Sequence, residues 1–150
     1  GTNNTYVEWI AVEFSGLLDI SVLDKVNSAN GTTTTPTVTS AATTQANEVV
    51  LGCLAVSGSS SLGIDLPAGY SQLHLHDSSS DTMGHLSAYK IVSATGAQTF
   101  DGGTVSAAAP RWAICVATYK GTGGAPAIID TGAIMKPKYR PRPFAPGIAR

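Results

Sequence analysis

The chain has 150 residues, and only 13% of them are charged, about half the share of an average soluble protein. This length fits one domain that can bury a core without disulfides or metals. The low charge argues against a helical protein, whose surface is usually rich in Glu, Lys and Arg, and no run of about 18 apolar residues is present to span a membrane. We therefore expect an all-β protein with no membrane partner.

Short β-branched and aromatic runs bounded by Gly, Pro, Asn or Ser predict the strands. In chain order they are residues 6–14, 37–43, 48–56, 70–76, 85–92, 98–100 with 104–106, and 112–119, with weaker candidates at 20–26 and 127–129. No stretch has a sustained apolar period of 3.6 residues, so helices should be few. This spacing favours an antiparallel β-sandwich, jelly-roll-like, over residues 1–130.

The runs differ in how much of their surface they should bury. Residues 48–56 are apolar on both faces, which predicts a central strand. Trp9 and Trp112 lie in aliphatic runs and should be core residues. Residues 27–36, with the sequence NSANGTTTTP, are too polar to pack and predict a mobile loop.

Two cysteines, Cys53 and Cys115, also lie in apolar strand runs. The simplest interpretation is a pair of buried thiols that act as small hydrophobic side chains. A disulfide between them would need Cα atoms within about 7 Å, which the sequence does not establish. Whether they are bonded is left open here.

Residues 70–76 alternate, with Leu73 and Leu75 on one face and Gln72, His74 and His76 on the other. The second face is a candidate ligand surface. Two histidines at i and i+2 can share a metal ion, and Asp77, Asp81 and His85 follow in the sequence. Spacing fixes no third ligand, however, so we expect no metal site and no cofactor.

No motif for catalysis stands out. The chain lacks a Gly-x-Ser-x-Gly elbow, and Glu8 and Glu13 have opposite strand parity, so they do not form a carboxylate pair for glycoside cleavage. The glycines at 102–103 and 121–124 lack the context of a phosphate-binding loop and are typical of turns. We expect a protein without enzymatic activity and assign no catalytic residue.

Charge is divided by position. Residues 1–130 hold all ten carboxylates and four cations, a formal charge of −6, whereas residues 131–150 hold five cations and no acid, a formal charge of +5. Four prolines between 137 and 146 keep this C-terminal arm extended, which reduces the entropy lost on binding. Its predicted contact residues are Lys136, Lys138, Tyr139, Arg140, Arg142, Phe144 and Arg150.

The arm admits three interpretations. It could be a solvated chain end, or a nucleic-acid-binding segment with Tyr139 and Phe144 as stacking groups. An acidic body would repel phosphates, which disfavours nucleic acid. We favour docking along another protein, because the acidic body of a neighbouring copy is the obvious complement to the basic arm.

The order of the segments WIAVEFSG, a Thr-rich loop, TTQANEVVLG, LPAGYSQL, SAYKIV and RWAICVATYKG resembles β-sandwich modules of tailed-phage structural proteins and related bacterial surface proteins. The resemblance covers residues 9–121 and implies a structural or adhesive module on a virion or cell surface. The arm similarly resembles the extended segments by which phage head and tail proteins hold their neighbours.

Together these features predict a virion structural protein, a capsid decoration or a tail or fibre component. Its partners would be other copies of itself and neighbouring virion proteins, in an extracellular assembly. The alternative is a carbohydrate-binding or adhesin module that binds surface glycans through Gln72, His74 and His76. That alternative is weakened because few aromatic residues are expected to be exposed, and a sugar platform needs exposed rings.

Overall fold

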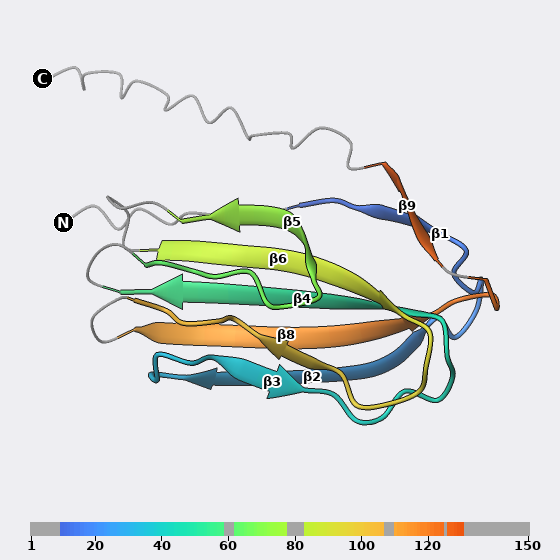
Figure 1. Ribbon diagram of the computed structural model, residues 1–150, viewed down its shortest axis with the longest axis horizontal. Helices are drawn as coiled ribbons and strands as arrows, with labels where there is room; N and C mark the ends of the chain where they lie inside the picture. The colour runs from blue at the N-terminus through green and yellow to red at the C-terminus, as the bar shows by residue number, and fades with distance from the viewer. Residues whose placement is uncertain (1–9, 59–61, 78–82, 107–109, 125, 131–150) are drawn as a thin grey trace, which may run out of the picture.

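The computed structural model describes residues 10–58, 62–77, 83–106, 110–124 and 126–130. These residues form nine strands and no helix, arranged in antiparallel sheets (Figure 1). The predicted all-β, sandwich-like fold is therefore confirmed. The strands are β1 (Glu13–Ser15), β2 (Leu23–Gly31), β3 (Thr37–Thr39), β4 (Glu48–Ser57), β5 (Ser71–His76), β6 (Met83–Val92), β7 (Thr99–Asp101), β8 (Arg111–Lys120) and β9 (Ala127–Asp130).

The main layer is a five-stranded sheet in the order β2-β8-β4-β6-β5. Its middle strand is β4, as its apolar character on both faces predicts. The β4 side chain Leu54 lies opposite Leu86 of β6 and Ile114 of β8, and all three are buried. Such cross-strand apolar contacts fix the register, because a slip of one residue would turn every one of these side chains towards solvent.

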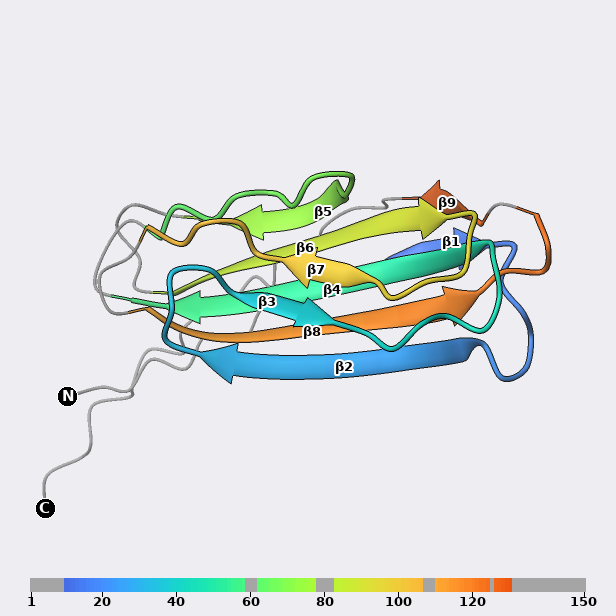
Figure 2. The same ribbon diagram turned by 60° about the horizontal axis from the view of Figure 1, so that its bottom comes forward.

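A second, smaller layer covers one face of this sheet. It contains the paired strands β3 and β7, in which Val38 lies opposite Phe100 (Figure 2). The fully buried Phe100 ring lies directly over Gly52 of β4. Tyr70 meets that ring edge-on at 5.1 Å and donates a hydrogen bond from its hydroxyl to the Thr99 carbonyl. The core therefore lies between β3 and β7 on one side and the middle of the five-stranded sheet on the other.

The rest of the second layer is hydrogen-bonded but irregular. The predicted strand at 104–106 is absent, because Gly102 and Gly103 interrupt the run and Gly103 has a φ of 63°, in the left-handed region. Instead, the amide of Val105 donates to the Thr34 carbonyl, and that of Ser106 donates to the Leu62 carbonyl. Val105 and Leu62 are both fully buried, so this irregular segment also contributes to the core.

The prediction of a loop at residues 27–36 is wrong for its first half. Residues 27–31 are the second half of β2, an edge strand paired with β8. This half of the strand shows no apolar alternation because an edge strand can keep polar side chains on its surface. Asn27, for example, donates a hydrogen bond from Nδ2 to the Thr39 carbonyl. Gly31 allows the ring of Trp112 to pack closely on the backbone, since a Cβ there would lie 2.6 Å from the ring.

Trp112 is a core residue only in part. Its ring packs against the buried cluster from the start of β8 but stays partly exposed. Its indole Nε1 donates to the Thr33 carbonyl at 2.8 Å, which requires the ring edge to lie near the loop after β2. The other predicted core tryptophan, Trp9, lies outside the described residues.

A two-stranded sheet of β1 and β9 lies at one end of the molecule (Figure 1). Residues 6–9 of the predicted first strand, 6–14, lie outside the described residues, residues 10–12 form no strand, and β1 begins only at Glu13. Phe14 lies opposite Ile128 of β9, whose strand was predicted at 127–129. The Phe14 ring also contacts Tyr89 of β6 at 5.6 Å, which anchors β1 to the main sheet.

Candidate interaction surface

The other face of the five-stranded sheet carries no β3–β7 pair, although β1 contacts it at one end through Phe14 and Tyr89. We call this the outer face. Its centre is formed by the small exposed side chains of Cys53 and Ala55 on β4 and of Ala113 and Cys115 on β8. The prediction that the cysteines are buried is therefore wrong. Since side chains alternate along a strand and the buried Leu54 faces the core, its neighbour Cys53 must face outwards.

Larger apolar residues surround this small-residue centre. Val26 on β2 is 65% exposed, Met83 on β6 is 49% exposed and Ile91 on β6 is 40% exposed. All three lie opposite outer-face positions of the neighbouring strands. The outer face is therefore apolar and largely uncharged at its centre, a composition that suits contact with another surface.

Three histidines form a row on this face at the β5–β6 edge. The rings of His74 and His85 are stacked, 4.5 Å apart between centroids and 14° from parallel, and His76 lies 6.1 Å from His85. The prediction that His74 and His76 share a face is confirmed. The sequence did not connect His85 with them on one strand face, because its place between them depends on the register of β5 against β6.

Gln72 does not belong to the same row. It lies opposite the core position Ala88, while His74 lies opposite the next residue, Ser87, so the register shifts between them. The shift is an irregularity of the β-bulge type, which breaks the strict alternation on which the predicted ligand face of Gln72, His74 and His76 depended. In the described part of the chain, no three His, Cys, Asp or Glu side chains are grouped so as to hold a metal ion.

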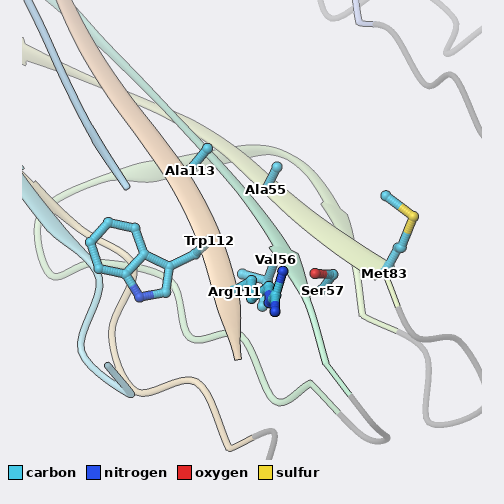
Figure 3. A pocket seen from close by; sticks show the side chains of 7 residues that line it. All are labelled: Ala55, Val56, Ser57, Met83, Arg111, Trp112 and Ala113. Carbon is cyan, nitrogen blue, oxygen red and sulfur yellow. The ribbon is translucent and has the colours of Figure 1, made fainter. Parts of the chain in front are cut away.

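A shallow pocket of about 240 Å³ lies where β4 ends and β6 and β8 begin. Figure 3 shows that Met83 and Trp112 lie on its opposite sides, with Arg111 and Ser57 between them. Ala55, Val56 and Ala113 complete the lining. The lining joins apolar groups to one cation, so the pocket extends the outer face rather than forming a separate polar site.

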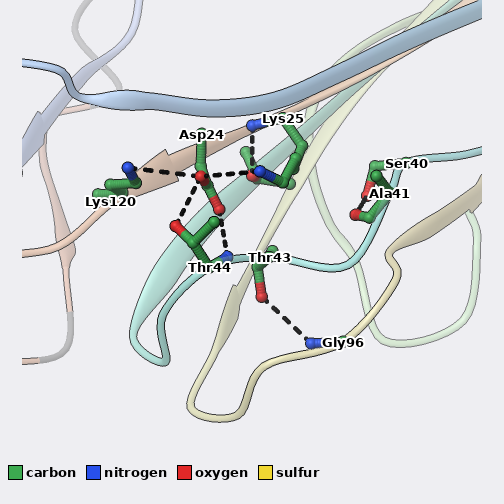
Figure 4. A network of polar contacts seen from close by, with 9 residues as sticks. Asp24, Lys25, Ser40, Ala41, Thr43, Thr44, Gly96 and Lys120 are labelled. Atoms are coloured by element: carbon green, nitrogen blue, oxygen red, sulfur yellow. Dashed lines mark hydrogen bonds and ion pairs between the residues drawn. The ribbon is translucent and has the colours of Figure 1, made fainter.

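Polar contacts are concentrated at the opposite end of β4, around Asp24 (Figure 4). Its carboxylate accepts hydrogen bonds from the amide and hydroxyl of Thr44, at 2.6 and 2.7 Å, and its side chain is only 2% exposed. Lys25 and Lys120 place their ammonium groups 3.3 and 3.4 Å away. Although burial pushes the pKa of Asp24 up, the hydrogen bonds from Thr44 outweigh it and hold the pKa well below the usual value.

A second carboxyl group, Glu48, lies beside Asp24 and is fully buried. Burial raises the pKa of Glu48 above its usual value, and the Asp24 carboxylate adds to the rise. Opposite shifts in two adjacent carboxyl groups also occur in acid–base sites. Here both groups are withdrawn from solvent, and Asp24 joins β2 to Lys120 of β8 and to the loop at Thr44, so the arrangement is a structural connection.

In the described body, most cations make internal contacts, whereas most carboxylates are exposed. Three of its four cations make internal contacts: Lys25 and Lys120 pair with Asp24, and Lys90 lies over the Tyr70 ring at 4.7 Å. Five of the described carboxylates are exposed, namely those of Glu13, Asp19, Asp65, Asp77 and Asp101. Exposed carboxylates are therefore the most numerous charged groups on the surface of the described body.

All of the predicted arm contacts, Lys136, Lys138, Tyr139, Arg140, Arg142, Phe144 and Arg150, lie outside the described residues. The searched part of the chain contains no helix long and apolar enough to cross a membrane. No protein-family model, no curated protein and no solved structure matches this chain.

Proposed function

We propose that this chain is a non-enzymatic structural protein of a phage virion, a capsid decoration or a tail or fibre component. Its basic C-terminal arm docks on the acidic body of a neighbouring copy or another virion protein. The supporting observation is the division of charge: exposed carboxylates on the described body, with three of its four cations used internally. The five cations of residues 131–150 are the complement to that surface.

The outer face supports the same proposal. Small and apolar side chains make it flat enough for close contact with another protein, while the buried core on the other side keeps the sheet rigid. An extended segment rich in proline loses little entropy when it binds such a rigid surface. Electrostatic attraction then directs the arm to its partner, and apolar contacts by Tyr139 and Phe144 provide further affinity.

A labelled peptide of residues 131–150, mixed with a chain ending at Asp130, tests the docking directly. We expect saturable binding by fluorescence anisotropy that weakens as salt is raised, because exposed charges are screened. A matched peptide with its five Lys and Arg residues replaced by Gln is the control and should bind much more weakly. Equal binding of the two peptides, or no binding of either, would contradict the proposed role of the arm.

The virion location has its own test. Peptides of this chain should be found by mass spectrometry in particles purified by density gradient, at a fixed ratio to the major head or tail proteins. Their absence from purified particles would contradict a virion component while leaving arm-mediated self-assembly intact.

The histidine row favours one alternative, the carbohydrate-binding or adhesin module. Its planar rings lie on the sheet face opposite the second layer, where a sugar could contact them. A glycan array distinguishes the two functions, with a His74→Ala and His76→Ala double variant as the control. Specific glycan binding that is lost in this variant would support the alternative.

A further inference from the structure

Cys53 and Cys115 lie directly opposite each other on the adjacent strands β4 and β8. Directly opposed residues in an antiparallel pair have Cα atoms about 4.5 or 5.5 Å apart. Both values fall within the range of about 4.4 to 6.8 Å that disulfides bridge. The strands therefore need no backbone movement to allow a bond between these two sulfur atoms.

The surroundings of the pair leave it accessible. Both cysteines are exposed on the outer face. The next outer-face positions along the same strands are Ala55 and Ala113, which lie side by side and carry only methyl groups (Figure 3). A small thiol or disulfide reagent can reach the sulfur atoms without displacing a large side chain.

The two thiols also differ in their surroundings. The thiol of Cys115 hydrogen-bonds to Cys53 and lowers the pKa of Cys53, and the Ser87 hydroxyl, 3.6 Å from its sulfur, acts in the same direction. The pKa of Cys115 is raised in return. Because the thiolate is the nucleophile and the Ser87 hydroxyl lies beside the Cys53 sulfur, we infer that Cys53 attacks first and that Cys115 resolves the intermediate.

We propose that Cys53 and Cys115 form a reversible redox site on the outer face, which closes to a cross-strand disulfide by exchange with low-molecular-weight disulfides. The Cys53 thiolate attacks one sulfur of the small disulfide, giving a mixed disulfide and one released thiol. The Cys115 sulfur, as it loses its proton, then attacks the Cys53 sulfur and releases the second small thiol. The protein dithiol is oxidised to a disulfide, and the small disulfide is reduced to two thiols.

Closure would link two neighbouring central strands across a loop of about 60 residues. By chain entropy, such a link shifts the unfolding equilibrium constant by about a thousandfold in favour of the folded state. Both cysteines lie in the described body. In an oxidising extracellular setting it would hold the sheet closed, and in a reducing cytosol it would stay open.

Oxidised glutathione is the probe for this site. The full chain, purified in reductant and then incubated with oxidised glutathione, should lose both free thiols and two hydrogen atoms in mass without a glutathione adduct. The Cys115→Ser variant should instead retain one glutathione on Cys53. Two adducts per wild-type chain, two unreacted thiols, or a disulfide between chains would each overturn the proposal.

Thermal unfolding with and without reductant provides a second measurement. Oxidation should raise the melting temperature of the wild-type chain by about 10 °C, from the expected entropy and a domain of this size. The double variant Cys53→Ser and Cys115→Ser should show no such dependence. An equal response of wild type and double variant would overturn the proposal even if the thiols disappear.

Discussion

Replacing Gly52 with alanine should destabilise the protein, because the Phe100 ring already occupies the position of the new methyl group. An added Cβ would overlap three carbon atoms of that ring, among them Cε2 at 2.5 Å. Contacts this short force the ring, and with it β7, away from β4. The substitution thus tests how the second layer is held on the five-stranded sheet.

Two opposing effects set the magnitude. Overpacking a core typically costs about 1 to 3 kcal/mol, and complete displacement of the ring approaches the 3 to 5 kcal/mol of a Phe to Ala truncation. Replacing a strand glycine gains back about 0.5 to 1 kcal/mol in chain entropy. We therefore expect Gly52→Ala to lower the free energy of unfolding by about 2 to 4 kcal/mol.

In equilibrium unfolding by urea, this loss appears as a lower urea concentration at the midpoint. The slope of the unfolding free energy against urea concentration should be unchanged. Gly96→Ala is the matched control: its new Cβ would have only Gln98 Nε2 nearby, at 3.9 Å, so its stability should stay within about 0.5 kcal/mol. The double variant Gly52→Ala and Phe100→Ala should lose at least about 1 kcal/mol less stability than the sum of the losses of the two single variants. Stability of Gly52→Ala equal to that of Gly96→Ala, or strict additivity, would refute the packing of Phe100 on Gly52.

Two further predictions concern the buried carboxyl groups. Asp24→Asn leaves Lys25 and Lys120 without their anion, so it should lower the free energy of unfolding in urea by about 3 kcal/mol. The control Asp19→Asn removes an exposed charge and should keep a stability near that of wild type. Equal effects of the two substitutions would contradict the central role of Asp24. The raised pKa of Glu48 means that the folded state holds its proton more tightly than the unfolded state, so this stabilisation is full below pH 4.5 and is lost as pH rises through the folded pKa. Glu48→Gln imitates the protonated form, so the melting temperature of the variant minus that of wild type should increase between pH 5 and 8. A difference that stays constant over this range would show that Glu48 does not titrate in this way.

The main sheet was predictable because its central strand carries an unambiguous signal. Residues 48–56 are apolar on both faces, which favours a position between two other strands. The inward side chains and Val49 are indeed buried, while Cys53 and Ala55 are exposed. The edge strand β2 was not predictable over 27–31, because an edge strand open to solvent needs no apolar alternation. Its polar residues therefore have the composition of a loop.

The candidate sites depend on register, which sequence alone does not fix. Cys53 and Cys115 were expected in the core because their neighbours are apolar, yet both lie at strand positions whose side chains face outwards. The displacement of Gln72 from the histidine row follows from a single irregularity between β5 and β6. The contact of Asp24 with Glu48 joins residues from separate strands, and no local pattern predicts it.

We propose that residues 131–150 assemble the protein, and light scattering after size-exclusion chromatography measures this assembly. The comparison is between the full chain and a chain ending at Asp130, which retains every described residue. We expect the full chain to form a defined oligomer that dissociates at high salt. The truncated chain should be a monomer with an unchanged melting temperature. A truncated chain that forms the same oligomer as the full chain would contradict this proposal.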